Sequence, residues 1–412
     1  MMLKTIRWSD SVRVILLCLV AVSPSLPTAV SALGRLILYL AALAYILGRI
    51  GNRQRPPSAE HGPVHTWVIF SAIAYMALTV VWSSVGTSQG LEVWTRHARI
   101  LTIPIMVCMI ASLGEARMLL RVFIWGQVFV VFSSYLQVFG FAVPWATGAW
   151  QGHYAVFSSY LEQCITQAIL VGLLWFQRDS VFGKSGRWLA ILLAALTAYL
   201  TVGLMPGRSG HAVLFALIAL MAVYAIPKKY RWASALIPVL LFMLLQVASP
   251  VFGERMRLVV TEVKAHLHGS KEATSSGQRL QYWQKSLEAV AEKPLFGHGA
   301  GSWNQEYMRL MGTQQPNIVY STSDPHNIFL IWAVEGGLLG ASLLGAMLLS
   351  LWRFSYSLTM AEQQTMQVLV MGIFIAGLFN SVLFGIGLGD FFCIGIGILA
   401  AFKGLPNRQA VS

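Results

Sequence analysis

Apolar segments long enough to cross a membrane follow one another along almost the whole chain. A helix needs roughly 17–25 predominantly apolar residues to cross a hydrocarbon core about 30 Å thick, and about twelve segments meet this requirement. Hydrophobic residues make up 56% of the 412 residues and charged residues 11%, which is more apolar surface than a water-soluble core can bury. The sequence therefore predicts an all-α polytopic membrane protein. The candidate spans cover residues 12–30, 33–50, 64–84, 98–113, 117–140, 154–177, 187–205, 209–226, 231–249, 326–352, 362–384 and 386–403, and residues 23–27 of the first contain two prolines that favour a turn.

One long polar segment, residues 250–325, interrupts this pattern between the ninth and tenth spans. It divides the chain into residues 1–249, which hold spans one to nine, the polar segment itself, and residues 326–412, which hold spans ten to twelve and a short tail. Apolar residues recur at helical spacing within the polar segment, so we predict a helical insertion that rests on the outer leaflet. Its predicted helices are Arg255–Leu267, Gly277–Glu292 and Ser302–Met311, and the apolar face of the second comprises Leu280, Trp283, Leu287 and Val290.

Lysine and arginine are distributed unevenly between alternate loops. The short loops on one side carry only Arg35, Arg96, Arg99 and Arg208. Basic residues concentrate in cytoplasmic loops, so the other side is predicted to be the cytoplasm, with both termini inside and residues 250–325 outside. The net charge of +13 then reflects topology and contact with anionic lipids, and its scattered distribution argues against nucleic acid as a partner. The basic residues of the predicted inside segments are Lys4, Arg7, Arg13, Arg49, Arg53, Arg55, Arg117, Arg121, Arg178, Lys184, Arg187, Lys228, Lys229, Arg231, Arg353, Lys403 and Arg408.

Two arginines are candidates for binding an anion. Arg208 lies in the tight outside turn between spans seven and eight, where Pro206 and Gly207 break the helix. The N–H groups at the start of the next helix favour anions at such a place. An interfacial arginine that serves only as an anchor is the alternative. Arg279, near the start of predicted helix Gly277–Glu292, is either the second member of an anion site or a solvated surface charge.

The segment Asp324-Pro325-His326-Asn327 joins the polar insertion to span ten. His326 can act as a base near neutral pH if it lies within hydrogen-bonding reach of a hydroxyl group, and it is otherwise an interfacial histidine. Asp324 is predicted to cap the following helix, with Pro325 in the first turn. Asp390 lies near the outer end of spans eleven and twelve, where an unpaired carboxylate is costly. It is predicted to orient His326, to pair with an arginine, or to be solvated in a loop.

Metal-binding patterns are sparse in this sequence. His266 and His268 are two residues apart on a predicted helix and therefore point in different directions, and His298 has no partner at a suitable spacing. The four cysteines, Cys18, Cys108, Cys164 and Cys393, fall within predicted spans and lack ligand spacing. We therefore predict neither a metal site nor a cofactor. The alternative is that the dispersed acids Glu162, Asp324 and Asp390 converge in the fold and bind a metal ion together with the substrate.

Three motifs together resemble the O-antigen ligase and polymerase superfamily of bacterial envelope enzymes. The resemblance covers about residues 190 to 400, and the His-Asn opening of span ten is its most specific part. The motifs are Gly207-Arg208-Ser209-Gly210, Arg279 with Trp283 and Pro294-Leu295-Phe296-Gly297-His298-Gly299, and His326-Asn327-Ile328-Phe329-Leu330 with Glu335-Gly336-Gly337-Leu338-Leu339-Gly340.

The resemblance implies an inverting glycosyltransferase of the bacterial inner membrane. Such an O-antigen ligase moves O-antigen polysaccharide from undecaprenyl diphosphate to lipid A–core oligosaccharide at the periplasmic face. By resemblance, Arg208 and Arg279 bind the donor diphosphate and His326 activates the acceptor hydroxyl. Two guanidinium groups can hold a leaving diphosphate in place of a metal ion. Supporting roles are expected for Asp324, Asn327 and Asp390.

Two other functions remain open at this stage. An O-antigen polymerase of the same superfamily shares the polar insertion and the arginines. A secondary transporter with about twelve spans is the alternative from another class of protein. Transporters usually contain internal repeats and place ionisable groups near the middle of the membrane. This sequence has no evident repeat, and its candidate groups lie at one face, which favours the transferase.

Overall fold

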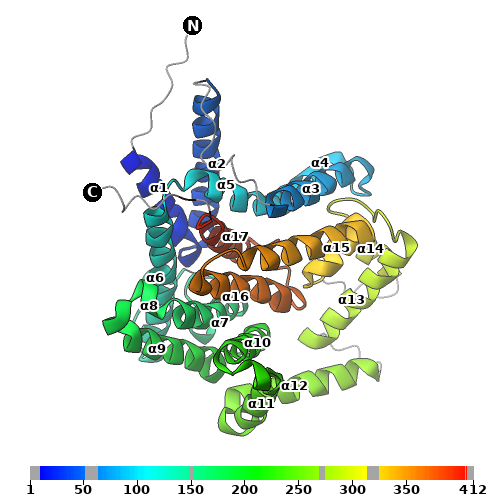
Figure 1. Cartoon of the computed structure of the whole chain (residues 1–412). Helices are drawn as coiled ribbons and strands as arrows, with labels where there is room; N and C mark the ends of the chain where they lie inside the picture. The colour runs from blue at the N-terminus through cyan, green and yellow to red at the C-terminus, as the bar shows by residue number, and fades with distance from the viewer. Residues whose placement is uncertain are drawn as a thin grey trace.

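The computed structural model describes residues 10–51, 64–147, 152–268, 274–312, 324–403 and 405, and all regular structure in these ranges is helical (Figure 1). Lys4, Arg7, Arg53, Arg55 and Arg408, and most of the predicted tail, lie outside the described residues. The first half of the described chain contains α1 (Asp10–Val22), α2 (Thr28–Gly51), α3 (Val64–Leu78), α4 (Thr87–His97), α5 (Thr102–Met109), α6 (Leu113–Val138), α7 (Tyr160–Phe176), α8 (Arg178–Val181) and α9 (Gly183–Tyr199). The second half contains α10 (Arg208–Ala225), α11 (Leu236–Ala248), α12 (Pro250–Leu267), α13 (Ser275–Glu292), α14 (Trp303–Met311), α15 (Ile328–Ser355), α16 (Met360–Gly377) and α17 (Ile386–Ala400).

Regular structure in the described residues is entirely helical, so the all-α prediction is confirmed. Six stretches of helix in these residues are long and apolar enough to cross a membrane, which is consistent with a multi-pass membrane protein. The figure of twelve spans is not confirmed. The six stretches are Thr28–Tyr45, Leu113–Val138, Gly183–Leu204, Arg208–Ala225, Lys228–Ala248 and Ile328–Ser355.

The predicted span 98–113 shows why the number differs. Its main helix, α5, has eight residues, which at about 1.5 Å per residue cannot cross a hydrocarbon core. The helix ends because the chain becomes extended at Ile110, and Ser112 then caps α6 by accepting a hydrogen bond from the N–H of Glu115. The proline-containing turn in the first predicted span is confirmed, since α1 ends at Val22 and α2 begins at Thr28.

The largest core lies where α15, α16 and α17 pack against the surrounding helices. In Figure 1, α15 and α16 run side by side, with α3 along the other side of α15. α7 packs between α9, α10 and α16, and α17 contacts α2, α5 and α6. This arrangement brings the beginnings of α10 and α15, which are far apart in sequence, toward the same part of the molecule as α13.

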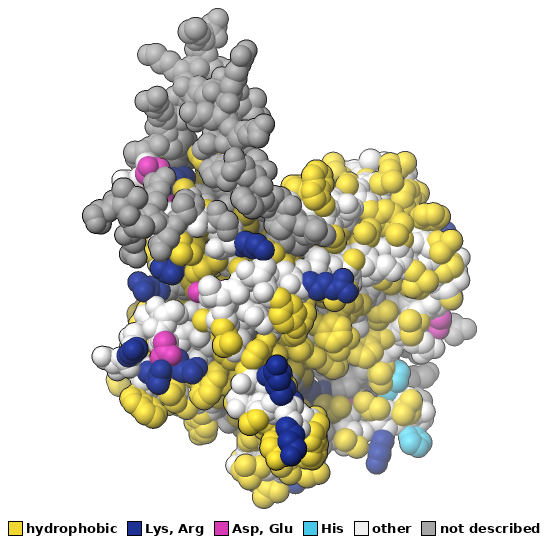
Figure 2. Space-filling model, in the orientation of Figure 1, with side chains coloured by type: hydrophobic (Ala, Val, Ile, Leu, Met, Phe, Trp, Pro, Cys, Tyr) yellow, Lys and Arg dark blue, Asp and Glu magenta, His cyan; other side chains and the backbone are white. Residues whose placement is uncertain are grey.

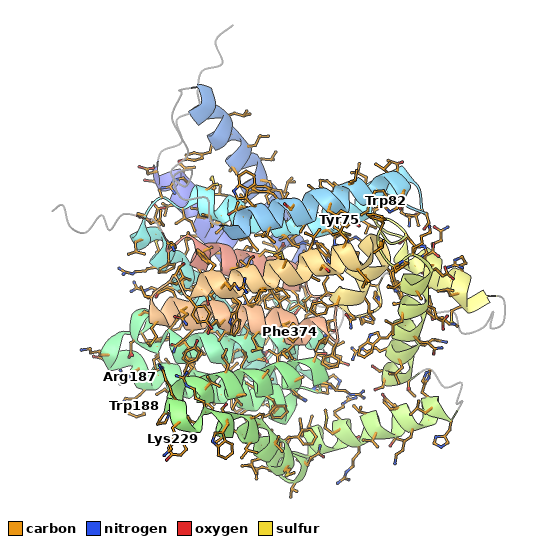
Figure 3. The ribbon with its side chains drawn as sticks, turned by 45° about the vertical axis from the view of Figure 1, so that its right-hand side comes forward. Tyr75, Trp82, Arg187, Trp188, Lys229 and Phe374 are labelled. Carbon is orange, nitrogen blue, oxygen red and sulfur yellow. The ribbon has the colours of Figure 1, made fainter. Side chains whose placement is uncertain are left out.

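The outside of the helical bundle is extensively apolar. Yellow hydrophobic side chains cover much of the face drawn in Figure 2, with basic side chains interspersed. α11 contributes no buried residue, and its Val247 side chain is 88% exposed. Exposed apolar surface of this extent fits contact with lipid. At the end of the bundle where α9 begins, Arg187, Trp188 and Lys229 lie near one another (Figure 3), a pairing of basic and aromatic residues typical of a membrane interface.

The three predicted helices of the polar segment are present as α12, α13 and α14. The predicted apolar face of α13 is correct only in part: Trp283 and Val290 pack against a core, but Leu287 is 60% exposed. The buried residues of the helix include Tyr282, Ser286 and Ala289. The reason is the tertiary contact with α14, whose Trp303 Nε1 donates a hydrogen bond to Ser286 Oγ at 2.8 Å. A small second core holds α13 and α14 against α15. It consists of Tyr282, Ala289, Trp303, Tyr307 and Val334.

A glycine-rich turn between α13 and α14 packs backbone to backbone against a kink in α15. The kink is at Gly337, which has a φ of 66°, and a Cβ at this position would lie 2.2 Å from the carbonyl oxygen of Leu295. The N–H of Gly299 donates to the Glu335 carbonyl at 2.9 Å. On the other side Tyr75, labelled in Figure 3, donates its hydroxyl to the Gly336 carbonyl at 2.7 Å. The Gly-rich motif therefore fixes the path of α15.

Replacing Gly337 by alanine is expected to destabilise the protein. The left-handed conformation and the clash with Leu295 together cost about 2 kcal/mol or more, which should lower the melting temperature in detergent by several degrees. Thermal unfolding followed by intrinsic fluorescence measures this change. Gly345→Ala on the same helix is the matched control, because Gly345 is exposed and an added Cβ there meets nothing within 4 Å. Equal melting temperatures for the two variants would contradict the backbone contact.

Candidate functional site

His326 lies in the short turn that leads into α15. Its φ of 52° is left-handed, which is uncommon for a residue other than glycine and is frequent at functional sites. Asp324 Oδ1 holds this turn by accepting hydrogen bonds from the His326 N–H and from Ser381 Oγ, each at 2.7 Å. The same oxygen lies 3.4 Å from His326 Nδ1. Asp324 therefore orients the imidazole ring and favours a proton on Nδ1, which leaves Nε2 as the basic nitrogen.

Asn327, not Asp324, caps α15. Its Oδ1 accepts hydrogen bonds from the N–H groups of Phe329 and Leu330 at 3.0 and 3.1 Å, and its Nδ2 donates to the Leu378 carbonyl at 3.1 Å. The predicted cap at Asp324 is therefore wrong by three residues. The cause is the left-handed turn at His326, which delays the start of the helix to Ile328. The tight turn leaves the Asp324 carboxylate beside the imidazole instead of over the helix end.

Two residues of α13 contact the same turn. Trp283 Nε1 donates a hydrogen bond to the Pro325 carbonyl at 3.2 Å. The ring of Tyr282 lies beside that of His326, with centroids 6.2 Å apart. These contacts join α13, which carries Arg279, to the turn that carries His326. Packing of the Tyr282 and Trp283 side chains therefore sets the distance between Arg279 and His326.

Arg208 is the first residue of α10, as its predicted place in a helix-breaking turn requires. The approach of this turn to α7 is so close that a Cβ on Gly207 or Gly210 would lie within 2.6 Å of Cys164. Nη1 of Arg208 donates to Ser276 Oγ at 2.7 Å, and its guanidinium group forms an ion pair with Glu262 at 3.1 Å. The sequence did not indicate Glu262, whose partner lies on a separate helix.

Arg279 lies one turn into α13 and is half-buried. Burial lowers the pKa of its guanidinium group, and the positive charge of Arg208 lowers this pKa further, whereas Tyr160, Glu262 and Asp324 raise it. Arginine remains protonated despite such a shift. Unlike Arg208, Arg279 has no ion pair within the residues that the structure describes. Arg279 is close enough to Arg208 and Asp324 to interact electrostatically with both. The two predicted anion-binding arginines and the His326 turn therefore lie in the same region of the molecule.

Burial lowers the pKa of His326 below its ordinary value, although the Asp324 carboxylate raises it; the nearby charge of Arg279 lowers it further. The imidazole is therefore neutral at neutral pH, which is the state that a general base requires.

His326 and Asp324 open onto a cavity of about 720 Å³. The cavity is formed by residues from α2, α4, α7, the His326 turn, and the segment between α16 and α17. Arg208 and Arg279 are not among the residues that line it. Its polar lining consists of Arg35, Tyr39, Thr95, Arg96, Arg99, Ser159, Glu162, Asp324, His326, Asn380 and Ser381.

Asp390 is fully buried and pairs with arginine. Its Oδ1 forms an ion pair with Arg35 and lies 3.5 Å from Arg99 Nε, and Ser31 Oγ donates to its Oδ2 at 2.8 Å. Of the three predicted alternatives, the geometry selects the pair with an arginine over contact with His326 or solvation. The acids Glu162, Asp324 and Asp390 do not converge within 4.8 Å in the part of the chain that the structure describes.

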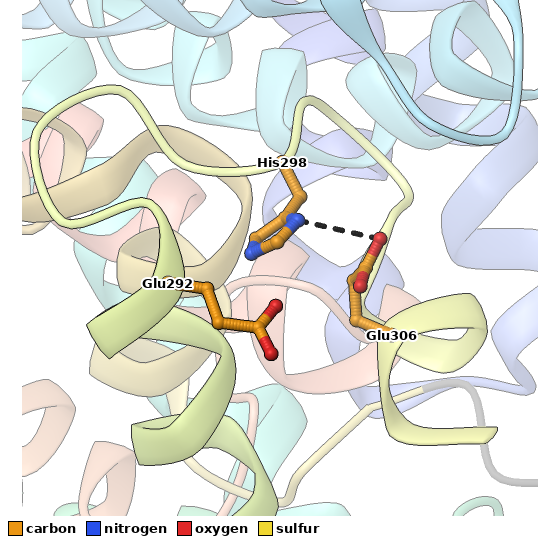
Figure 4. Close-up of side chains that lie close together, drawn as sticks. All are labelled: Glu292, His298 and Glu306. Atoms are coloured by element: carbon orange, nitrogen blue, oxygen red, sulfur yellow. Dashed lines mark ion pairs between the residues drawn. The ribbon is translucent and has the colours of Figure 1, made fainter. Parts of the chain in front are cut away.

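Glu292, His298 and Glu306 do come together, with one potential ligand atom from each within 4.8 Å of the others (Figure 4). The expectation that His298 has no partner is wrong, because the glycine-rich turn folds α14 back against the end of α13. His298 Nδ1 lies 3.3 Å from Glu306 Oε1, and Arg309 forms ion pairs with both glutamates. His298 Nε2 lies 2.9 Å from the Ala289 carbonyl oxygen and donates to it. Arg309 pairs with the carboxylates of Glu292 and Glu306, so these ion pairs connect α13 to α14.

Together, the all-helical fold and its long apolar helices are consistent with a multi-pass membrane protein, and a polar cavity lies beside His326. Residues 189–345 match the model of the protein family described as O-Antigen ligase. This region includes Arg208, Arg279 and His326, and the match supports the resemblance to the O-antigen ligase superfamily found in the sequence.

A protein of Haemophilus influenzae, described as an uncharacterized protein, is 26% identical over 213 residues. The aligned region makes up 50% of this chain and 53% of that protein, so the chain spans about half the length of the curated relative that it matches.

Proposed function

We propose that this protein is an O-antigen ligase, a metal-independent, inverting glycosyltransferase at the periplasmic face of the bacterial inner membrane. The donor is a glycan on undecaprenyl diphosphate, and the acceptor is lipid A–core oligosaccharide. The observation that carries the proposal is the arrangement of a neutral His326, oriented by Asp324, in electrostatic contact with Arg279 and its neighbour Arg208. A general base beside an anion-binding pair is what transfer from a diphosphate requires.

The reaction is a single displacement. His326 Nε2 removes the proton from the acceptor hydroxyl as its oxygen forms a bond to the anomeric carbon of the donor sugar. The bond between that carbon and the diphosphate oxygen breaks, and its electron pair leaves with the diphosphate. Arg208 and Arg279 stabilise the charge that develops on this leaving group, since guanidinium groups bind phosphate oxygens in a bidentate manner. Attack from the side opposite the leaving group inverts the anomeric carbon.

The direct test combines purified protein, undecaprenyl diphosphate-linked glycan and lipid A–core in detergent or proteoliposomes. Glycosylated lipid A–core with an inverted linkage, formed in the presence of excess chelator, is the expected product. Elongated glycan on undecaprenyl diphosphate would identify a polymerase instead. Loss of activity in chelator that magnesium or manganese restores would overturn the metal-independent mechanism. Movement of labelled substrate across proteoliposomes without a new glycosidic bond would favour the transporter.

The pH dependence of transfer should report the state of His326. Because burial lowers the pKa of this imidazole, kcat/KM is expected to be constant at neutral pH and to fall only as the pH drops through a value below about 6.5. Asp324 raises that pKa, so Asp324→Asn should move the acidic limb to still lower pH while reducing the maximal rate. Initial rates between pH 4.5 and 8 measure both effects. If the acidic limb of the kcat/KM profile is identical in the wild type and in Asp324→Asn, the His326 imidazole is not the general base.

The topology can be tested at the beginning of α13. Ser275 is exposed there, so a cysteine at this position should react with a membrane-impermeant thiol reagent in cells whose outer membrane alone is permeable. The motivation is the uneven distribution of lysine and arginine, which places residues 250–325 in the periplasm and both termini in the cytoplasm. A cysteine at exposed Lys184, in the predicted inside segment, is the matched control. Labelling of the Ser275 site only after rupture of the inner membrane would reverse the orientation.

A further inference from the structure

Three arginines line one wall of the cavity that His326 opens onto: Arg35 of α2, Arg96 of α4 and Arg99 of the short helix that follows it, Ala98–Leu101. We call this group the arginine wall. It is separate from Arg208 and Arg279, which are not part of the cavity lining. His326 belongs to both neighbourhoods, because it lines the cavity and is electrostatically coupled to Arg279. The arginine wall and the proposed diphosphate site are therefore two separate groups of arginines that both neighbour the proposed base.

The Asp390 carboxylate does not neutralise the positive charge of the arginine wall. Asp390 carries one negative charge and is shared between Arg35 and Arg99, whose side chains are 17% and 4% exposed. Arg99 Nη1 donates to the Phe384 carbonyl oxygen at 2.7 Å, and its buried Nε lies 3.5 Å from Asp390 Oδ1 without forming a hydrogen bond within the described residues. A buried guanidinium group with an unused donor is costly. This pair of arginines thus keeps an excess of positive charge beside the cavity.

Arg96 adds a third positive charge at a more accessible position. Its guanidinium group lies over the ring of Phe384, 5.0 Å from the centroid, and its Nη2 is 3.4 Å from Glu92. The Glu92 side chain is 70% exposed, and an ion pair with so much contact with water is weak. An anion that enters the cavity can therefore compete for Arg96 at little cost.

The remaining polar lining suits a sugar. Glu162 and Ser159, at the start of α7, together with Asn380 and Ser381 provide carboxylate, amide and hydroxyl groups. Such groups can exchange hydrogen bonds with sugar hydroxyls. Glu162 is in electrostatic range of Arg99, so one carboxylate of the lining lies close to the arginine wall. A saccharide that carries both hydroxyl groups and an anionic group is complementary to this lining.

We propose that this cavity is the acceptor site and that Arg35, Arg96 and Arg99 bind a phosphoryl group carried by the acceptor saccharide. The proposal rests on the proposed function, because it uses His326 as the base. A base must contact the acceptor hydroxyl, and the cavity is the space onto which His326 opens. The donor diphosphate also carries anionic phosphoryl groups that arginine can bind. The experiment must therefore distinguish a phosphoryl group of the acceptor from one of the donor.

The test uses purified full-length protein and two probes: lipid A–core oligosaccharide, and the same preparation stripped of phosphate with aqueous hydrofluoric acid. Equilibrium binding is measured without donor, and the KM for undecaprenyl diphosphate-linked glycan is measured separately. Arg96→Gln is the main variant, because the ion-pair partner of Arg96 among the described residues, Glu92, is largely exposed, and Arg35→Gln is the second. Arg187→Gln, an exposed arginine paired with Asp179 at another end of the bundle, is the matched control.

Wild type and Arg187→Gln are expected to bind the phosphorylated acceptor roughly 10-fold to 100-fold more tightly than the stripped one. Arg96→Gln should lose most of this preference while the KM for donor stays unchanged. Equal binding of both acceptors by the wild type would overturn the proposal, even if ligation proceeds. A raised KM for donor with unaltered acceptor binding would assign the wall to the donor. Preferential binding of the phosphorylated acceptor without any ligation would instead refute the proposed function.

Discussion

Replacing His326 by alanine should lower the rate of glycan transfer by ~10²–10⁴-fold, the usual effect of removing a general base. The alanine variant loses an imidazole that lines the cavity and whose Nδ1 lies 3.4 Å from Asp324 Oδ1. Donor binding should persist, because Arg208 and Arg279 are unchanged. The measurement is kcat for transfer by purified protein, with melting temperature and donor binding recorded on the same preparation.

His268→Ala is the matched control for this experiment. His268 is exposed at the end of α12, where its Nδ1 donates to the Lys264 carbonyl, and it is not among the residues that line the cavity. This variant should transfer glycan at the wild-type rate. A well-folded His326→Ala protein with wild-type kcat would show that another group, for which Glu162 is the candidate on the cavity, accepts the proton.

Replacing Arg279 by lysine should lower kcat/KM by roughly 10²-fold, although the positive charge is retained. Loss of one donor that stabilises a developing negative charge typically has an effect of this size. Lysine cannot supply the planar fork that binds two phosphate oxygens together, and its ammonium group is more strongly hydrated. Arg208→Lys should be impaired for the same reason. The steady-state kinetics of transfer, with donor and acceptor varied in turn, measure both changes.

The control is Arg257→Lys, which alters an exposed arginine on α12. It should leave both kinetic constants at their wild-type values. Normal turnover by Arg279→Lys would reduce this residue to a generic positive charge. A rise in KM with unchanged kcat would mean that Arg279 binds the donor equally in the ground state and the transition state.

Local signals in the sequence predicted the helices well. The prolines at Pro24 and Pro27 marked the break between α1 and α2, and the helical periodicity placed α13 within two residues of its observed start. The buried face of α13 could be predicted only in part, because Tyr282 and Ser286 are buried by aromatic residues of α14 that lie in a different part of the chain. The number of spans is not confirmed, since hydropathy alone does not show where an apolar stretch such as residues 98–113 turns.

The candidate site was predictable where a residue stood out by its position in the topology. Arg208 lies in a predicted short outside loop, and His326 precedes a helix. The same signal was present for Arg35, Arg96 and Arg99, the other arginines of the predicted short outside loops. Their convergence depends on the packing of α2, α4 and α17, which no local pattern encodes. The pairing of Arg208 with Glu262 likewise requires the return of α12 across the start of α10.

The ion pair between Arg208 and Glu262 bears on how the enzyme releases its by-product. Burial raises the pKa of Glu262, but hydrogen bonds from Arg208 and Ser276 outweigh this effect and hold it below its usual value, so the carboxylate is charged at neutral pH. Under the proposed function, an arriving diphosphate must displace this carboxylate from Arg208. When transfer is complete, Glu262 can return to the guanidinium group and expel the spent undecaprenyl diphosphate. Under the proposed function, the internal carboxylate is a counterion that weakens donor affinity and favours release of the product.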